Sequence, residues 1–233
     1  MKPSVLIIDK DQRSNEHLRG FLHGRYEVTA APTIKEAFDF LDAHNYDVVI
    51  GDFLDFRKEK NNLPHEIRQI RPNVKVALIT ALDTEHYINY LPDWNCLHVL
   101  PKLPFYNARD VLLFVENLLD PENAFGLPRY LSMDADWSKF RIKGKKDKNK
   151  KVEEIINFFA GCEYEIHELY DVRLLMEELI NNAIFHAFVD EAGNDKYQSG
   201  NFEALDEDED IYLEYGADAT TIGFSVTDNR GRL

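Results

Sequence analysis

Ser4-Val-Leu-Ile-Ile8 is an apolar run that ends abruptly in Asp9-Lys10-Asp11. An unbroken apolar run of this length is typical of a strand that is buried on both faces of a parallel sheet. Similar runs follow at residues 47–50, 74–79 and 97–100, and amphipathic stretches separate them. The alternation predicts an α/β domain with a doubly wound parallel sheet over residues 1–120.

The stretches between these runs have helical patterns. Thr33-Ile-Lys-Glu36 has the form of a capping box, in which a threonine and a glutamate satisfy the first free N–H groups of a helix. A last helix is expected from about Asn107 to Leu119, with Val111, Phe114 and Leu118 among its inward residues.

Polar residues follow the strands at the edge where open α/β sheets place their sites. Asp9 and Asp11 follow the first strand, Asp52 the third, Thr80 the fourth and Lys102 the fifth. Clustered carboxylates can hold Mg²⁺, which neutralises a phosphoryl group during its transfer. A lysine and a hydroxyl can then pair with the oxygens of that group.

This arrangement resembles the receiver domain of two-component response regulators, and the resemblance covers all of residues 1–120. It implies a flavodoxin-like (βα)5 fold and a cognate sensor histidine kinase as the phosphoryl donor. By the same resemblance Asp52 is the phosphoacceptor, Asp9, Asp11 and Asp52 hold Mg²⁺, Thr80 is the switch hydroxyl and Lys102 pairs with the phosphoryl group.

Several positions depart from the receiver pattern. Lys10 stands where the family usually has a second acid, and Val99 stands at the aromatic switch position. The loop that begins at Asp52 lacks the usual proline and glycine. A phosphorylatable receiver and a degenerate, constitutive one are therefore both compatible with the sequence.

Residues 121–138, which contain Pro121, Gly126 and Pro128, are interpreted as a linker, so a second domain is expected over residues 139–233. A strand is expected at 140–143. Eight basic residues lie between Lys139 and Lys151. We interpret this run as a solvated loop rather than as a surface for nucleic acid or anionic lipid, because the chain as a whole is acidic.

The rest of the second domain has the order helix, helix, polar loop and two strands. One helix has its apolar face around residues 152–159, and a second is expected from about 170 to 188. The inward residues expected for the second helix are Val172, Leu175, Met176, Leu179 and Ala183. Two strands follow at 211–215 and 221–226, and the last leads into Asp228.

Glu178 and Asn182 are four residues apart and so share one face of the second helix. With His186, Asp228 and Gly231 they resemble the N-box and the Asp/Gly box of GHKL ATP-binding domains, particularly the anti-sigma-factor serine kinase branch. The resemblance implies that Asn182 ligates Mg²⁺, Glu178 acts as the base, Asp228 contacts the adenine of ATP and Gly231 shapes the turn. His186 is expected to be a packed or capping histidine.

In that fold the chain continues past the Asp228 turn with a glycine-rich segment and further strands, whereas this sequence stops at Leu233. The resemblance therefore predicts an α+β GHKL-like sandwich that is incomplete at its C-terminus.

Composition limits the classes of partner. The net charge of −15 disfavours nucleic-acid binding, and no apolar run reaches the length of about 20 residues that a membrane span needs. Cys96 and Cys162 have no metal-site spacing and fit a reducing compartment. We therefore expect a cytoplasmic protein without a membrane or nucleic-acid partner.

These observations favour a response regulator whose receiver controls an anti-sigma-kinase-like, ATP-binding output domain, which acts on a protein target of the anti-sigma or anti-anti-sigma type. The oligomeric state is open, and a homodimer is compatible with this interpretation. The alternative is a non-enzymatic, partner-switching adaptor with degenerate receiver and nucleotide sites. A DNA-binding response regulator is disfavoured by the charge.

Overall fold

The computed structural model of the chain describes residues 2–58, 62–96, 98–102, 107–162, 169–198 and 201–230. The chain divides into two compact units, residues 1–124 and residues 125–233. Each unit has its own sheet and its own hydrophobic core.

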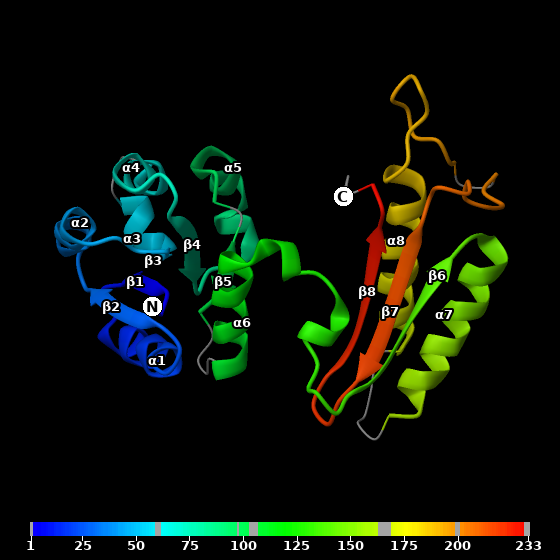
Figure 1. Cartoon of the computed structure of the whole chain (residues 1–233), viewed down its shortest axis with the longest axis horizontal. Helices are drawn as coiled ribbons and strands as arrows, with labels where there is room; N and C mark the ends of the chain where they lie inside the picture. The colour runs from blue at the N-terminus through cyan, green and yellow to red at the C-terminus, as the bar shows by residue number, and fades with distance from the viewer. Residues whose placement is uncertain are drawn as a thin grey trace. The chain divides into compact units, whose positions relative to one another are not determined.

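Unit 1 contains a five-stranded parallel sheet in the order β2-β1-β3-β4-β5 (Figure 1). This is the strand order of flavodoxin-like doubly wound folds. The strands are β1 (Ser4–Ile8), β2 (Glu27–Ala31), β3 (Val48–Asp52), β4 (Lys75–Thr80) and β5 (Val99–Pro101). The predicted parallel sheet is thus confirmed, although residue 97 of the expected fifth strand lies outside the described residues.

Helices cover both faces of this sheet, so that its apolar strands are buried on both sides (Figure 1). Helices α1 (Gln12–Leu22) and α6 (Ala108–Leu119) pack on one face. The other face carries α2 (Ile34–Ala43), α3 (Phe53–Lys58) and α4 (Leu63–Ile70). Thr33 is the N-cap of α2, and its hydroxyl accepts a hydrogen bond from the Glu36 N–H, as the capping-box pattern predicts.

Between β4 and β5 the chain forms only short helical pieces. These are η1 (Thr84–His86), η2 (Ile88–Tyr90) and α5 (Leu91–Trp94). Asn95 ends this stretch in the left-handed region, with φ at 46°. A (βα)5 fold would have one regular helix between these two strands, whereas this chain has three short helical pieces there.

Gly51 lies at the point where β3 leads into α3 and has no room for a side chain. A Cβ atom placed on it would lie 2.0 Å from Cζ of Phe56, whose fully buried ring packs against the strand. The glycine is therefore required by this close approach, because a ring in a packed core cannot move aside without displacing its neighbours.

Unit 2 consists of a three-stranded antiparallel sheet with two helices on one face (Figure 1). The strands are β6 (Asp136–Ile142), β7 (Ile211–Ala217) and β8 (Ile222–Asp228), in that order across the sheet. The helices are α7 (Lys145–Ala160) and α8 (Leu169–His186). The order strand, helix, helix, strand, strand follows the expectation from the sequence.

The stretch expected to link the domains packs onto the sheet of unit 2 instead of running free. Leu127, in η4 (Leu127–Arg129), is buried, and its N–H donates to Oε2 of Glu214 at 2.7 Å. Leu131 is also buried and approaches Gly216. The first strand of this sheet begins at Asp136 rather than at residue 140, because seven of its residues pair in register with β7.

The prediction that the basic run forms a loop is wrong. Residues 145–151 are the first two turns of α7, which starts directly after Gly144. Lysine is a good helix former, and Glu154 pairs with both Lys150 and Lys151 one turn away.

The prediction for α8 is wrong in part. Met176 and Ala183 are buried as expected, and Ile180 and Ile184 complete the buried stripe. Leu175 and Leu179, expected inward, are 58% and 41% exposed. The helix is rotated so that these two leucines lie on its flank rather than on the face that meets the sheet.

Among the described residues, no helix is long and apolar enough to cross a membrane.

The close approach at Gly51 generates a stability prediction. Gly51→Ala should lower the free energy of unfolding of unit 1 by about 1–3 kcal/mol, because it overpacks the core against Phe56. Gly20→Ala is the matched control, since Gly20 is exposed inside α1 and nothing lies within 4 Å of its Cβ position. That substitution should stabilise by roughly 0.5–1 kcal/mol.

Both can be measured by urea denaturation in a Trp137→Phe background, where Trp94 of unit 1 is the remaining tryptophan. Equal effects of the two substitutions would contradict the steric role assigned to Phe56.

Candidate functional site

Three polar side chains meet at the carboxyl edge of the parallel sheet. Asp9 follows β1, Asp52 ends β3 and Lys102 follows β5. Asp9 is 1% exposed and Asp52 is 6% exposed. Parallel strands all end at the same edge, so the fold itself brings together residues that are far apart in sequence.

The ammonium group of Lys102 lies between the two buried carboxylates. Its Nζ donates to Oδ2 of Asp9 at 2.6 Å and to Oδ2 of Asp52 at 3.3 Å. Burial alone would lower the pKa of Lys102, but the hydrogen bond to Asp9 and the charges of Asp9 and Asp52 outweigh it and raise that pKa. A fixed cation therefore neutralises two acids that would otherwise repel each other.

The Asp52 carboxylate is held in a defined orientation by the start of α3. Its Oδ1 atom accepts hydrogen bonds from the N–H groups of Leu54 at 2.9 Å and Asp55 at 3.2 Å. These bonds leave Oδ2 facing Lys102. One oxygen is thus fixed by the backbone while the other is presented to the cation.

Thr80 ends β4 and is buried at the same edge of the sheet. Its Oγ1 atom accepts a hydrogen bond from the N–H of Leu82 at 3.1 Å, and its carbonyl accepts one from the N–H of Lys102. The backbone of the threonine therefore positions the lysine.

The Asp11 side chain is directed at the start of α1 and not at the two buried acids, Asp9 and Asp52. Its side chain caps that helix by accepting from the N–H groups of Arg13 and Ser14. Its Oδ2 atom is 3.9 Å from the Lys102 ammonium, farther than the acids of Asp9 and Asp52. The N–H of Asp11 donates to Oδ1 of Asp9 at 2.9 Å.

Lys10, the main departure from the receiver pattern, has a partner that the sequence did not reveal. Its ammonium lies 3.1 Å from Oδ1 of Asp55, and its N–H donates to the other oxygen of the same carboxylate. Asp55 therefore holds Lys10 beside the site. The positive charge of Lys10, which stands where the family usually has a second acid, is neutralised by this carboxylate.

The acidic residues at this edge supply some of the ligands that a Mg²⁺ ion needs. Two buried carboxylates at one edge suit this ion, which is usually bound by one or two carboxylates together with water and phosphate oxygens. In the part of the chain that the structure describes, no group of three or more His, Cys, Asp or Glu side chains could hold a metal by itself. Asp9 and Asp52 are the ligands that the geometry favours, with Asp11 used as a helix cap.

An aromatic cluster adjoins the site and was missed by the sequence analysis. Phe53, the residue after Asp52, lies with its ring centroid 6.0 Å from Tyr87, 5.5 Å from Tyr90 and 5.4 Å from Trp94. Tyr87 lies between η1 and η2, Tyr90 ends η2 and Trp94 ends α5, so the residue beside Asp52 packs directly on the short helical pieces between β4 and β5.

The candidate residues of unit 2 are less enclosed. Glu178 is exposed and Asn182 partly buried on α8. Asp228 ends β8, and its Oδ1 atom accepts from the N–H of Arg230 at 2.7 Å. The C-terminal ends of α8 and β8 point to the same end of the unit (Figure 1). Gly231 lies outside the described residues.

His186 is exposed, so the expectation of a packed histidine is wrong. It is exposed at the last residue of α8, and its Nδ1 atom lies 3.0 Å from Oδ2 of Asp195.

No protein-family model and no curated protein matches the chain. Solved structures similar to it are response regulator receiver domains, each covering about half the chain. A response regulator from Thermotoga maritima is 24% identical over 51% of this chain and 98% of its own, with a TM-score of 0.47. A CheY-like receiver domain protein from Methanospirillum hungatei JF-1 is 21% identical over 52% and 97%, with a TM-score of 0.47.

The response regulator TrrA from Thermotoga maritima, solved in complex with Mg²⁺ and beryllium fluoride, is 28% identical over 51% of this chain and all of its own, with a TM-score of 0.42. Because these TM-scores lie below 0.5, the function proposed below rests on the residues of this chain.

The position of Lys102 generates a pH-dependent stability prediction. Lys102→Gln should lower the free energy of unfolding of unit 1 by about 3 kcal/mol or more at neutral pH, because two buried carboxylates lose their counter-charge. The folded-state pKa of Lys102 is raised above its ordinary value of 10.5, so the stabilisation is complete below pH 10.5 and is lost as the pH rises through the higher folded value.

Urea denaturation from pH 6 to pH 11.5, in the Trp137→Phe background, checks this. The difference between wild type and Lys102→Gln should be constant up to pH 10 and narrow above it. Lys10→Gln is the control, since the Lys10 side chain is 56% exposed and such a surface cation contributes less than about 1 kcal/mol through its ion pair. Matching losses for the two variants would show that burial of Lys102 has no special role.

Proposed function

We propose that unit 1 is a receiver domain that accepts a phosphoryl group on Asp52 from the phosphohistidine of a sensor histidine kinase. The observation that carries this proposal is the Lys102 ammonium, held between the buried carboxylates of Asp9 and Asp52 at the carboxyl edge of a five-stranded parallel sheet. Buried acids paired with a fixed cation are a costly arrangement for stability alone. They suit a site where negative charge is transferred.

In this proposal an oxygen of Asp52 attacks the phosphorus, the bond from phosphorus to the donor breaks, and an acyl phosphate forms. Oδ2 is the candidate oxygen, because Oδ1 is occupied by the N–H groups that start α3. Lys102 then exchanges its contact with the carboxylate for one with a phosphoryl oxygen. Thr80 has a hydroxyl at the same edge that can donate to another phosphoryl oxygen.

Mg²⁺ supplies neutralisation of the phosphoryl oxygens when it is bound in such sites. Asp9 and Asp52 are the residues of this chain that would hold it. Lys102 remains within reach of both acids, so it keeps the local charge balanced before the phosphoryl group arrives.

Unit 2 is proposed as the output domain, of the GHKL type, with Mg²⁺ and ATP as ligands and a protein of the anti-sigma or anti-anti-sigma type as the target. Support comes from the order of its elements and from Glu178, Asn182 and Asp228 on α8 and β8. Asn182 would ligate Mg²⁺, Glu178 would act as the base and Asp228 would contact the adenine. Phosphorylation at Asp52 would shift the equilibrium between two states of the protein and so control access to the target.

A non-enzymatic adaptor is the second candidate, and two observations favour it. Lys10 replaces an acid and is neutralised by Asp55, while Asp11 is used as a helix cap. Glu178 is exposed rather than set in a pocket that excludes water, where catalytic carboxylates usually lie. In this alternative both folds serve to present surfaces to partners.

Phosphorylation gives the direct test of the first proposal. Incubation with acetyl phosphate and Mg²⁺ should add one phosphoryl group, detected by intact-mass spectrometry, and Asp52→Asn should abolish the addition. Asp9→Asn should slow it at least tenfold, because the second buried carboxylate is lost.

Asp55→Asn is the matched control, since Asp55 lies three residues away and contacts Lys10 rather than Lys102. The Asp55→Asn variant should still gain one phosphoryl group from acetyl phosphate. Modification that persists in Asp52→Asn would refute the assignment of the acceptor.

Calorimetry tests the proposal for unit 2. ATP should bind in the presence of Mg²⁺ and fail to bind Asp228→Asn, because the contact to the adenine amino group is lost. Glu178→Ala should bind ATP but fail to transfer its phosphoryl group to a serine. Asp171→Asn, an exposed acid in the first turn of α8, is the control. If the wild-type chain shows no heat of binding, the adaptor function is favoured.

A further inference from the structure

We propose that the cavity between the start of α7 and the C-terminal part of α8 binds a small organic anion, one carboxylate or phosphoryl group carried on an apolar body. The cavity has a volume of about 220 Å³. It is lined by Lys145, Lys148, Asn149, Asn181, Ile184, Phe185 and Phe202. The proposal does not depend on the function proposed above.

The basic run explains which cations are available to this cavity. Lys143, just before α7, is bound by the carbonyl oxygens of Glu207 and Glu209 and lies 3.2 Å from Oδ1 of Asp210. Lys150 and Lys151 pair with Glu154 inside the helix.

Lys145 and Lys148 differ from these lysines. Within the described ranges, neither forms an ion pair with a carboxylate, and both side chains line the cavity. Two lysines that form no ion pair there therefore line one small volume, although the chain as a whole has a net charge of −15. An anion in the cavity would pair with them.

Lys148 is the best-placed ligand. Its Nζ donates to Oδ1 of Asn181 at 2.5 Å, which fixes the ammonium at the wall of the cavity. Burial lowers the pKa of Lys148, the charge of Lys145 lowers it further, and the charge of Glu177 opposes both. Glu177 lies 3.4 Å from Arg173, which also pairs with Glu153, and within the described residues no ion pair joins Glu177 to Lys148. The ammonium is thus partly desolvated and would gain from contact with an oxyanion.

Part of the cavity lining is apolar. Ile184 is fully buried, and the rings of Phe185 and Phe202 meet edge to face with centroids 6.4 Å apart. This part of the lining would contact the carbon part of a ligand and disfavour a fully hydrated inorganic ion. The combination of two lysines with two phenyl rings indicates an amphipathic anion such as an aromatic carboxylate or an aryl phosphate.

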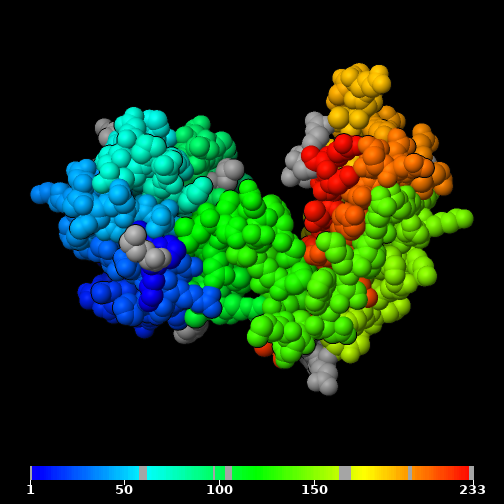
Figure 2. All heavy atoms as spheres, viewed as in Figure 1, coloured from blue at the N-terminus to red at the C-terminus, as the bar shows by residue number. Residues whose placement is uncertain are grey.

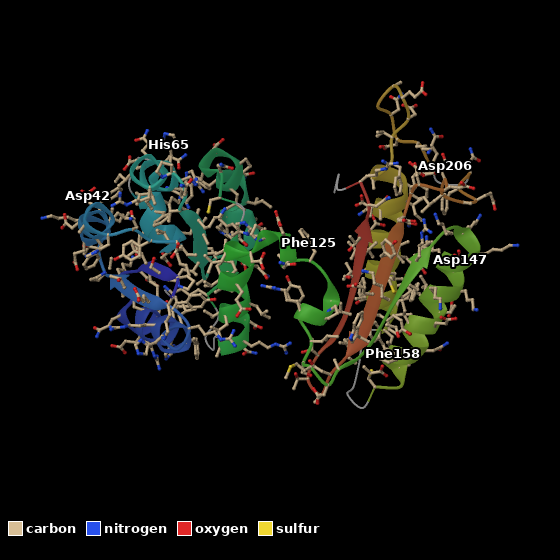
Figure 3. All side chains as sticks on the ribbon, viewed as in Figure 1. Asp42, His65, Phe125, Asp147, Phe158 and Asp206 are labelled. Carbon is tan, nitrogen blue, oxygen red and sulfur yellow. The ribbon has the colours of Figure 1, made fainter. Side chains whose placement is uncertain are left out.

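The segment that carries Phe202 is fastened to the start of α7. Lys145 N–H donates to the carbonyl of Glu203, and Leu205 N–H donates to that of Lys143. Gly144 allows this contact, since a Cβ there would lie 2.5 Å from the Glu203 carbonyl oxygen. In Figure 2 the orange atoms of this segment adjoin the green atoms of α7, and Figure 3 labels Asp147 on α7 and Asp206 in the neighbouring loop. The cavity is therefore built from tethered elements.

This site is separate from the nucleotide site proposed for α8. Asn181 and Asn182 are consecutive residues and so point about 100° apart around the helix. Asn181 contacts Lys148 of α7, whereas Asn182 lies on the flank that carries Leu175 and Leu179. Loss of one site can be measured without loss of the other.

Calorimetric titration of the full chain with phenyl phosphate, benzoate and inorganic phosphate tests the proposal. Phenyl phosphate or benzoate should bind at least tenfold more tightly than inorganic phosphate, and the better of the two identifies the preferred anionic group. Lys148→Gln should weaken that binding at least tenfold. Lys146→Gln is the control, because Lys146 is exposed on the same turn and does not line the cavity. Equal weakening by both variants, or no binding of either organic anion, would overturn the proposal.

A second measurement needs no variant. Acetylation of individual lysines of the wild-type chain, followed by peptide mass spectrometry, should show Lys148 protected by phenyl phosphate or benzoate while Lys146 reacts at an unchanged rate. Protection of both lysines, or of neither, would count against a ligand in this cavity.

Discussion

The structure of unit 1 depends on one partly buried cation, the ammonium group of Lys102. Asp9 and Asp52 are both almost completely removed from water, and two like charges at such a site are tolerated only with a counter-charge between them. Lys102 supplies that charge from a third strand end, so β1, β3 and β5 must end at the same level for the three groups to meet. The hydrogen bond from the Lys102 N–H to the Thr80 carbonyl fixes this level for β4 and β5. The contacts of Lys102 with the two acids therefore require the strand register that the sheet has, so the charge balance and the register cannot change separately.

The same constraint extends into the layer of helices beside Asp52. Gly51 lets the Phe56 ring lie against β3, and this close approach allows α3 to begin directly after Asp52, where its first N–H groups hold Oδ1. The ring of Phe53 then contacts the rings of Tyr87, Tyr90 and Trp94. Phe53 thus connects Asp52 to the segment between β4 and β5. A change in the charge at Asp52 therefore acts on a residue whose neighbour packs directly against that segment. That segment consists of the short helical pieces η1, η2 and α5 rather than one continuous helix.

Local patterns were sufficient for four strands of the parallel sheet and for the polar residues at its edge, whereas β2 was not among the predicted apolar runs. Each apolar run ends where a polar residue begins, and topology then places those polar residues together without further information. The partner of Lys10 could not be found in this way, because the contact with Asp55 depends on how α3 leaves β3. In α8, the 3.6-residue period shows that the helix has apolar stripes but does not determine which stripe faces the sheet. Leu179 and Ile180 are both apolar neighbours, and only packing against β8 decides that Ile180 is buried.

The charges of unit 2 show why net charge is a poor guide to local chemistry. The acidic segment 203–210 is matched by cations from other elements: Lys196 contacts Asp206 and Glu209, and Lys143 contacts Asp210. The hydrogen bonds to Asp206 and Glu209 raise the pKa of Lys196 well above its ordinary value, so this lysine stays charged throughout the physiological range. Lys145 and Lys148 form no ion pair among the described residues, and distant acids do not neutralise them, because screening limits such effects to about 10 Å. A chain with a large negative net charge can therefore present a local site for anions.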